Sequence, residues 1–197
     1  QLQSGCEITV RRMGRRTDHD GLRRLLDVAR SIAPAISIST DIMVGFPGET
    51  DDEFSKSLAF VESAGFSRLH VFRFSPREGT PAATMPARVP GSIVKVRSKK
   101  MLDLGARLEV DFILRFVGAT LRVLWESRER AGNGLRWSGL TDNYIRVTTE
   151  TRDGIDLTNS VTDTKILSTV PGGVVGSIDG VSIPARVVRP ELPLIQK

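Results

Sequence analysis

The sequence has a single cysteine, Cys6, among its 197 residues, which excludes an internal disulfide framework. Scarce cysteine is typical of a reducing compartment, so we expect a cytoplasmic protein. Long hydrophobic runs are lacking too. None approaches the roughly 18 residues of a membrane span, and no signal peptide is visible, so we expect no membrane partner. The first residue is Gln1 instead of methionine, and we therefore expect a fragment of a longer protein.

A strong excess of one charge is also lacking. Lys and Arg number 28 against 23 Asp and Glu, and the net charge of +5 with a pI near 9.9 is spread over both halves. Charge alone therefore fits an anionic partner without requiring one. Hydrophobic residues make up 40% of the chain, enough for a core, and the length suits one large domain or one medium and one small domain.

The most informative stretch, residues 36–54, reads ISISTDIMVGFPGETDDEF. Up to Val44 its side chains alternate between an isoleucine–valine face and a serine–aspartate face that carries Asp41, which predicts a β-strand. Glycines and a proline then predict a tight turn over residues 45–48. Thr50 and Glu53 form a capping-box pattern, which predicts a helix to about residue 64. In parallel α/β proteins, the carboxyl end of such a strand is where ligands bind.

The rest of the first 117 residues continues this alternation of helices and strands. We expect a helix over residues 20–32, a strand over 68–74, a proline-rich loop over 75–90 and a long helix over 92–116, basic at its start. The first of these helices has an apolar stripe of Leu22, Leu25, Leu26 and Ala29, and His19 before it is interpreted as a surface residue. This order predicts βα units and a parallel sheet. The polar face of strand 36–44 would then line the interior of an open barrel, and the alternative is an ordinary half-exposed strand.

Past residue 117, helical periodicity gives way to short β-prone segments. They cover residues 121–125, 135–140, 144–149 and 174–178, separated by Gly, Asn or Asp. This predicts a small antiparallel β-barrel, OB-like, of roughly 70–80 residues. The fold class is therefore α/β, with a partial (β/α) barrel over residues 1–117 and a small β-barrel over residues 118–197. Residues 151–173 have too little pattern for their strands to be placed.

Two polar clusters leave alternatives open. Four arginines within residues 11–16 form either a solvated basic face or an anion site, because guanidinium groups bind carboxylates and phosphates with two hydrogen bonds. In the second part, Arg136 and Arg146 lie near Asn143 and Tyr144 in the sequence. Cations with an aromatic and an amide are the mixture that holds phosphates and stacks unpaired bases. Tyr144 could equally be a cross-strand packing residue.

Several stretches, taken in order, resemble one known family, the radical S-adenosylmethionine methylthiotransferases. They are QSGC followed by RRMGRR, TDIMVGFPGET, FRFSPREGTPAATMP and SGLTDNYIRV. The resemblance covers nearly all of the chain and implies the second half of the radical barrel followed by a TRAM domain, a small β-barrel that binds tRNA. QSGC and SGLTDNYIRV resemble the branch acting on N6-threonylcarbamoyladenosine at position 37, next to the anticodon. A sibling acting on isopentenyladenosine or on a ribosomal protein, or a non-catalytic RNA-binding protein that retains the TRAM domain, stays an alternative.

The resemblance also implies cofactors and partners. Such enzymes hold one 4Fe–4S cluster on a CxxxCxxC motif, which reduces S-adenosylmethionine to a carbon radical, and a second 4Fe–4S cluster that supports sulfur delivery. A methylthio group ends up on carbon 2 of the adenine. This chain has no CxxxCxxC motif. We therefore expect no metal ligand and no catalytic residue in it, and interpret Cys6 as a packed thiol. The implied partners are the tRNA anticodon stem-loop, a reductant and a sulfur donor, with the protein a monomer.

Site residues follow from the resemblance by position. Gln3 and Ser4 would end the strand that meets the cofactor ribose, and Arg15 would face the methionine carboxylate. Asp41 fits an acceptor for ribose hydroxyls or the methionine ammonium. The predicted S-adenosylmethionine contacts are Gln3, Ser4, Arg15, Asp41, Gly45, Glu49 and Phe74, with Phe74 equally a plain core residue, and Pro76 to Thr80 would face the substrate. The predicted tRNA contacts are Arg136, Thr141, Asp142, Asn143, Tyr144 and Arg146.

Overall fold

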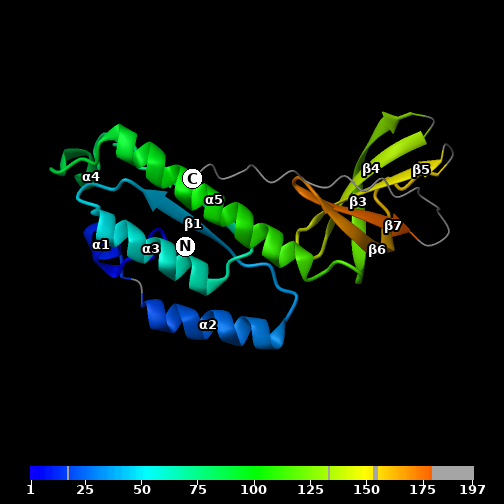
Figure 1. The fold of residues 1–197 in the computed structure, drawn as a ribbon, viewed down its shortest axis with the longest axis horizontal. Coiled ribbons are helices and arrows are strands. Elements are labelled where there is room, and N and C mark those ends of the chain that lie inside the picture. The colour runs from blue at the N-terminus through cyan, green and yellow to red at the C-terminus, as the bar shows by residue number, and fades with distance from the viewer. Residues whose placement is uncertain (17, 133, 153–154, 179–197) are drawn as a thin grey trace, which may run out of the picture. The chain divides into compact units, whose positions relative to one another are not determined.

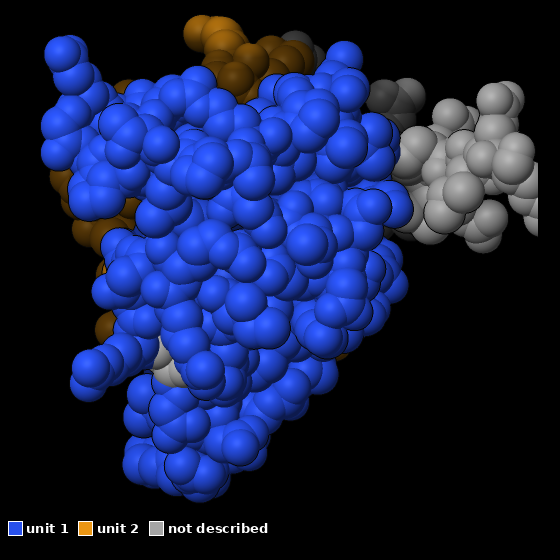
Figure 2. All heavy atoms as spheres, turned by 90° about the vertical axis from the view of Figure 1, so that its left-hand side faces the viewer, with its two compact units in different colours: residues 1–111 blue, residues 112–197 orange. Residues whose placement is uncertain are grey.

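The computed structural model describes residues 1–16, 18–132, 134–152 and 155–178. The chain forms two compact units, unit 1 over Gln1–Asp111 and unit 2 over Phe112–Lys197, which are coloured separately in Figure 2. The sequence predicts a division after residue 117. The assignment of the first part to a radical barrel and of the second to a TRAM domain stays a prediction.

Unit 1 alternates helices with two strands, as the sequence predicts (Figure 1). Its elements are α1 (Glu7–Arg12), α2 (His19–Ile32), β1 (Ser39–Val44), α3 (Asp51–Ala64), β2 (Arg68–Arg73), α4 (Pro81–Thr84) and α5 (Gly91–Leu114). The prediction of an uninterrupted loop over residues 75–90 is wrong, because α4 forms within it. Pro81 occupies the first turn of α4, where a missing backbone N–H costs nothing and the fixed φ favours the helix.

Strands β1 and β2 pair in parallel, with Asp41 opposite His70 and Met43 opposite Phe72. Gln3 forms a further parallel bridge to Ile42 on the other side of β1. The alternation predicted for β1 is confirmed, since Thr40, Ile42 and Val44 are buried while the residues between them are half-buried. Only these strands and the bridge are described, so the partial radical barrel stays a prediction.

One core lies on the isoleucine–valine face of this sheet. It unites β1 with side chains from α2, α3 and α5, among them Leu26, Phe54, Val61, Met101 and Leu104. Leu69 and Val71 of β2 pack against the same core. Because side chains alternate along a strand, Asp41, Met43, His70 and Phe72 share the opposite face, which this core does not cover.

Two side-chain predictions in α2 are wrong. His19 is buried, and its ring lies 4.3 Å from the ring of Phe60 in α3. Leu25 is 63% exposed, while Leu26 is buried in the core. Successive residues in a helix are rotated by about 100°, so Leu22 and Leu26 face the core and Leu25 points away from it.

Unit 2 is a closed barrel with the strand order β3-β4-β5-β7-β6. The strands are β3 (Thr120–Ala131), β4 (Gly134–Thr141), β5 (Arg146–Arg152), β6 (Val161–Val170) and β7 (Gly173–Ile178). This confirms an α/β chain with a small β-barrel. The prediction of a purely antiparallel barrel is wrong at one junction, where β5 and β7 pair in parallel. Strand β6 lies between them in the sequence and runs antiparallel to β7, so β7 has the same direction as β5. Strand β6 lies in the stretch where the sequence placed none.

Two tryptophans fill the barrel, Trp125 of β3 and Trp137 of β4, each at most 1% exposed. Their indole N–H groups donate to Thr162 and Thr151, so neither ring buries an unpaired donor. The last turn of α5 and the residues after it contribute Phe112, Ile113 and Phe116 to the same core.

Candidate functional site

The loop after β1, residues 45–49, lies where the sequence predicts a ligand. Gly45 has a φ of +76°, and a Cβ built on it would lie 2.5 Å from a methyl carbon of Val94 in α5. Both the backbone conformation and the space therefore require glycine. The Gly45 N–H donates to the Glu49 carboxylate at 2.8 Å, and the Gly48 N–H donates to the Ala87 carbonyl at 2.8 Å. The loop is thus bonded within itself and to the segment before α5.

Glu49 and Arg97 form a buried ion pair beneath this loop. The Glu49 side chain is 1% exposed and that of Arg97 6%. Arg97 Nη1 donates to Glu49 Oε2 at 2.8 Å and to the Glu49 carbonyl at 2.9 Å, and its Nη2 donates to Asp51 Oδ1 at 2.7 Å. Burial raises the pKa of Glu49 above its usual range, although Gly45 and Arg97 oppose that rise. Burial also lowers the pKa of Arg97, but the bonds to Asp51 and Glu49 outweigh it and the net shift is upward.

A second carboxylate, Glu53, joins α1 to the start of α3. Arg12 donates to both of its oxygens, at 2.7 and 3.0 Å, and the Thr9 hydroxyl donates to Oε2 at 3.2 Å. Glu53 also accepts from the Thr50 N–H at 3.1 Å, which completes the capping box that the sequence predicts. The hydrogen bonds from Arg12 are the main reason that the pKa of Glu53 lies below its usual value.

The predicted cofactor residues lie around β1 and its bridge. The Gln3 N–H donates to the Asp41 carbonyl at 2.9 Å, and Gln3 has a φ of +64°. Ser4 is fully buried, with its hydroxyl 3.4 Å from that of Ser57. Phe74 continues from β2, and its ring meets Phe46 of the loop edge-on at 5.3 Å. Gln3, Asp41, the loop and Phe74 therefore lie close in the fold: Gln3 bridges to β1, Asp41 lies in β1, and the loop and Phe74 follow the paired strands β1 and β2.

Arg15 and Asp41 differ in their surroundings. Arg15 is exposed on the segment after α1, and no hydrogen bond or ion pair among the described residues joins its side chain to the other candidates. Two other arginines within residues 11–16 do bind carboxylates: Arg12 binds Glu53, and Arg11 forms an exposed ion pair with Glu7 at 3.0 Å. Asp41 is half-buried on the uncovered face of β1, where its carboxylate makes no hydrogen bond or ion pair with any described residue. A carboxylate in that position can accept from the hydroxyls or the ammonium group of S-adenosylmethionine, so the residues present fit that cofactor.

Sequence reasoning missed the role of Arg97. The sequence shows only that the long helix is basic at its start, and Lys95, Lys99 and Lys100 of that segment are exposed. Arg97, however, lies three residues after Val94 and four before Met101, on the apolar stripe of α5. A charged residue at such a position is the signal that could have identified it, because it is buried only with a partner.

The predicted tRNA residues of unit 2 divide into a turn and two strand residues. In the turn, Thr141 and Asn143 are buried and Asp142 is exposed. The Tyr144 N–H donates to the Thr141 carbonyl at 3.0 Å, and the Ile145 N–H donates to the Thr141 hydroxyl at 2.9 Å. Tyr144 has a φ of +63° and is 69% exposed. The structure thus holds an aromatic ring in solvent on a rigid turn, instead of packing it across strands.

Arg136 and Arg146 already have carboxylate partners. Arg136 of β4 bonds Glu150 of β5 at 2.9 Å and Glu129 of β3 at 3.2 Å, its direct neighbours in register. Arg146 bonds Glu126 at 3.1 Å. All five side chains are substantially exposed, so these ion pairs are weak and a phosphate could displace the carboxylates. Even so, the local charge is less positive than the two arginines alone suggest.

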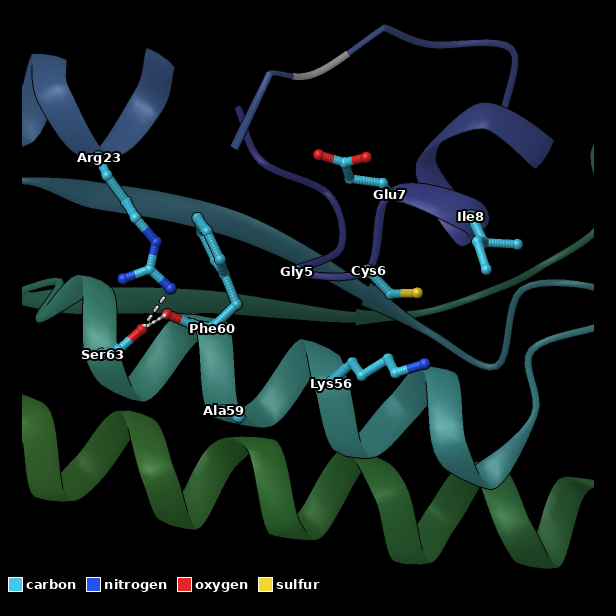
Figure 3. A pocket seen from close by; sticks show the side chains of 9 residues that line it. All are labelled: Gly5, Cys6, Glu7, Ile8, Arg23, Lys56, Ala59, Phe60 and Ser63. Carbon is cyan, nitrogen blue, oxygen red and sulfur yellow. Dashed lines mark hydrogen bonds between the residues drawn. The ribbon is translucent and has the colours of Figure 1, made fainter. Parts of the chain in front are cut away.

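A separate groove of about 610 Å³ lies beside α3 in unit 1 (Figure 3). Its lining includes Cys6, Ile8, Lys56 and Phe60. Arg23 crosses Phe60 with its guanidinium carbon 4.5 Å from the ring centre and donates to Ser63 at 2.8 Å. None of the residues predicted to bind cofactor or tRNA lines it. Cys6 itself is buried, as the sequence interpretation expects.

Within the part of the chain that the structure describes, no group of three or more His, Cys, Asp or Glu side chains could hold a metal ion. Among the helices so described, none combines the length and the apolarity needed to cross a bilayer.

Comparison with known proteins identifies relatives of the chain. No family model matches it. It is 44% identical over 125 residues to the threonylcarbamoyladenosine tRNA methylthiotransferase MtaB of Thermotoga maritima, covering 64% of this chain and 29% of that protein. It is 34% identical over 191 residues to the tRNA-2-methylthio-N(6)-dimethylallyladenosine synthase of Corynebacterium efficiens, covering 97% of this chain and 32% of that protein.

A third relative is named for a different substrate. The ribosomal protein uS12 methylthiotransferase RimO of Roseiflexus castenholzii is 40% identical over 133 residues, covering 68% of this chain and 28% of that protein. The chain spans about three tenths of the length of the curated relatives that it matches. Over the part that it spans, the chain belongs to the radical S-adenosylmethionine methylthiotransferases.

Proposed function

We propose that this chain is part of a cytoplasmic tRNA methylthiotransferase that adds a methylthio group to carbon 2 of N6-threonylcarbamoyladenosine at position 37. The observation that carries the proposal is the match to a Thermotoga maritima protein named for that modification, at 44% identity. A match over 97% of the chain to a second tRNA-modifying relative supports tRNA as the substrate class. In this proposal, unit 1 binds S-adenosylmethionine and unit 2 binds the tRNA.

The uncovered face of β1 and the loop after it support the cofactor role. Asp41 offers a carboxylate without a described partner, and parallel α/β sheets bind ligands at the carboxyl ends of their strands. Gly45 brings the loop backbone close to that end. S-adenosylmethionine, when bound, supplies the carbon radical that the chemistry requires. The residues of this chain bind and orient it, while the 4Fe–4S clusters require ligands from elsewhere in the protein.

The Thr141–Tyr144 turn supports the RNA-binding role. An aromatic side chain that is 69% exposed on a turn fixed by two hydrogen bonds can stack on an unpaired base at little entropic cost. Arg136 and Arg146 would exchange their carboxylate partners for phosphates. A small β-barrel with such a turn is the kind of module that binds single-stranded RNA.

The relatives are named for different substrates, and this supports a second candidate function, the modification of another substrate. The chain matches a dimethylallyladenosine-modifying synthase and a ribosomal-protein methylthiotransferase with comparable identity. These alternatives share the cofactor site and differ only in the molecule that receives the methylthio group.

Mass spectrometry of tRNA nucleosides tests the proposal. Deleting the gene that encodes this chain should remove the methylthio form of threonylcarbamoyladenosine, and reintroducing the gene should restore it. Loss of the methylthio form of dimethylallyladenosine instead would assign the sibling tRNA reaction to this chain. Loss of a methylthio group from a ribosomal protein would assign the ribosomal-protein reaction to it. An unchanged set of modified nucleosides and ribosomal proteins would leave a non-catalytic RNA-binding role.

A further inference from the structure

We propose that Arg97 positions the ligand-binding loop of unit 1: through the Glu49 carboxylate it fixes the backbone of residues 45–49 at the carboxyl end of β1. This inference rests on the proposed cofactor role of that loop. It assigns a function to a residue of α5 that lies far from the loop in sequence and belongs to none of the motifs described above.

The hydrogen bonds form a chain from α5 to the loop backbone. Arg97 Nη1 donates to Glu49 Oε2 at 2.8 Å, and the same oxygen accepts from the Gly45 N–H at 2.8 Å. Arg97 also bonds the carbonyl of Glu49 at 2.9 Å and Asp51 at 2.7 Å. One guanidinium therefore holds the last residue of the loop by its main chain, and the first residue of the loop through a shared carboxylate oxygen.

Stability alone is a poor explanation for this pair. Taking two charges out of water costs about as much as their attraction returns, so buried ion pairs are often replaceable by apolar residues. Here the cost is visible, because burial raises the pKa of Glu49 even with Arg97 beside it. In addition, Arg97 Nε is buried and has no hydrogen-bond partner among the described residues. A pair with this cost is better explained by the single loop conformation that it enforces.

The geometry also changes the role expected for Glu49. Its side chain is 1% exposed, and one of its oxygens already accepts from two donors. It therefore acts as the link between Arg97 and Gly45, and is a positioning residue instead of a contact to the cofactor. The face of β1 that carries Asp41 is left for the ligand.

Amide hydrogen exchange in the 197-residue chain tests the positioning role without any ligand. Arg97→Met should speed exchange at the Gly45 amide by about tenfold or more, because a hydrogen bond to a charged acceptor loses its support. Arg97→Lys keeps the charge but cannot bond Glu49 and Asp51 at the same time. Its exchange rate at the Gly45 amide should therefore lie between those of the wild type and Arg97→Met. Arg68→Met is the matched control, since it removes an exposed ion pair between β2 and Glu109 of α5 and should leave Gly45 unchanged. If Arg97→Met does not fold, an increase of at least about threefold in Arg97→Lys supports the inference.

Binding of S-adenosylmethionine to the same proteins tests the consequence. Titration followed by the amide shifts of residues 41–49 should show affinity about tenfold or more weaker in Arg97→Met than in Arg68→Met, with partial recovery in Arg97→Lys. Exchange at Gly45 within about twofold of wild type in both Arg97 variants would overturn the inference, as would faster exchange with equal affinity. A wild-type chain that does not bind S-adenosylmethionine would overturn only the proposed cofactor role, because exchange at Gly45 decides the positioning role separately.

Discussion

Replacing Arg12 by methionine should destabilise unit 1 in a way that depends on pH. Arg12 donates to both oxygens of Glu53 at 2.7 and 3.0 Å, and the Glu53 side chain is 7% exposed. Without Arg12, the donors to that carboxylate among the described residues are Thr9 and Thr50. Methionine preserves most of the apolar length of the side chain, so the change removes mainly the ion pair.

The size of the effect follows from the exposure of the two partners. Removing one member of a fully buried pair costs about 3–5 kcal/mol, whereas an exposed pair contributes at most about 1 kcal/mol. The Arg12 side chain is 29% exposed, and two donors to Glu53 remain in the variant. We therefore expect a loss of about 2 kcal/mol in the free energy of unfolding of unit 1 at pH 7.

The sign of the pH dependence follows from the lowered pKa of Glu53, which is caused chiefly by the hydrogen bonds from Arg12. A carboxyl with a lowered pKa in the folded state stabilises that state above its unfolded pKa of about 4.3. That stabilisation is lost as the pH falls through the folded value. The difference between wild type and Arg12→Met should therefore be full at about pH 6–7 and shrink toward about pH 3.

Urea unfolding between about pH 7 and pH 3 measures this difference, with each unit followed by its own signal. Both tryptophans lie in unit 2 and most of the helical residues in unit 1. Far-ultraviolet circular dichroism therefore reports mainly unit 1, and tryptophan fluorescence reports unit 2 and should not change. Arg68→Met, which removes an exposed ion pair, is the control and should lower the free energy of unfolding of unit 1 by less than about 1 kcal/mol. An Arg12→Met deficit that is the same at low pH as at neutral pH would refute the reasoning, because it would show that Arg12 acts through packing.

Three further predictions concern unit 2. Tyr144→Ala should weaken binding of a single-stranded anticodon-loop RNA by about 1–3 kcal/mol in a fluorescence anisotropy titration, while Tyr144→Phe keeps the ring and the affinity; equal affinities for both variants would exclude stacking. Glu150→Gln frees Arg136 from one carboxylate, so tRNA should bind more tightly, and the log–log salt slope should steepen by about 0.7–0.9 for each additional phosphate that the protein neutralises; an unchanged slope would make this face ordinary solvated surface. Gly139→Ala would place a Cβ 2.4 Å from the Leu124 carbonyl, so unit 2 should lose about 1–3 kcal/mol by tryptophan fluorescence, and a wild-type unfolding midpoint would contradict that clash.

The sequence predicts the segment from β1 to α3 well because each signal there is local. Alternation sets the faces of β1, glycines allow the turn, and the capping box of Thr50 and Glu53 starts α3. None of these features depends on what lies across the fold. The resemblance to methylthiotransferases also rests on contiguous stretches, and the relatives confirm it.

The predictions that failed depend on partners distant in sequence. His19 is buried because Phe60, 41 positions later, provides a ring for it to pack against. Strand β6 was not predicted because its alternation is interrupted: its register against β7 shifts between Ile166 and Ser168. Arg97 seemed one more cation in a basic segment, since its partners Glu49 and Asp51 lie nearly fifty positions earlier.

The end of α5 has a consequence for the design of gene fragments. Phe112, Ile113 and Phe116 are buried in the core of the barrel although they precede its first strand. Burying such side chains contributes about 1.5–3 kcal/mol each, so losing all three would cost an amount comparable to the net stability of roughly 5–15 kcal/mol that a small domain has. A clone that begins at residue 118 would encode every barrel strand and still lack this part of the core. A vector for the isolated barrel should therefore start several codons before Phe112, so that these side chains are retained with enough helix to hold them.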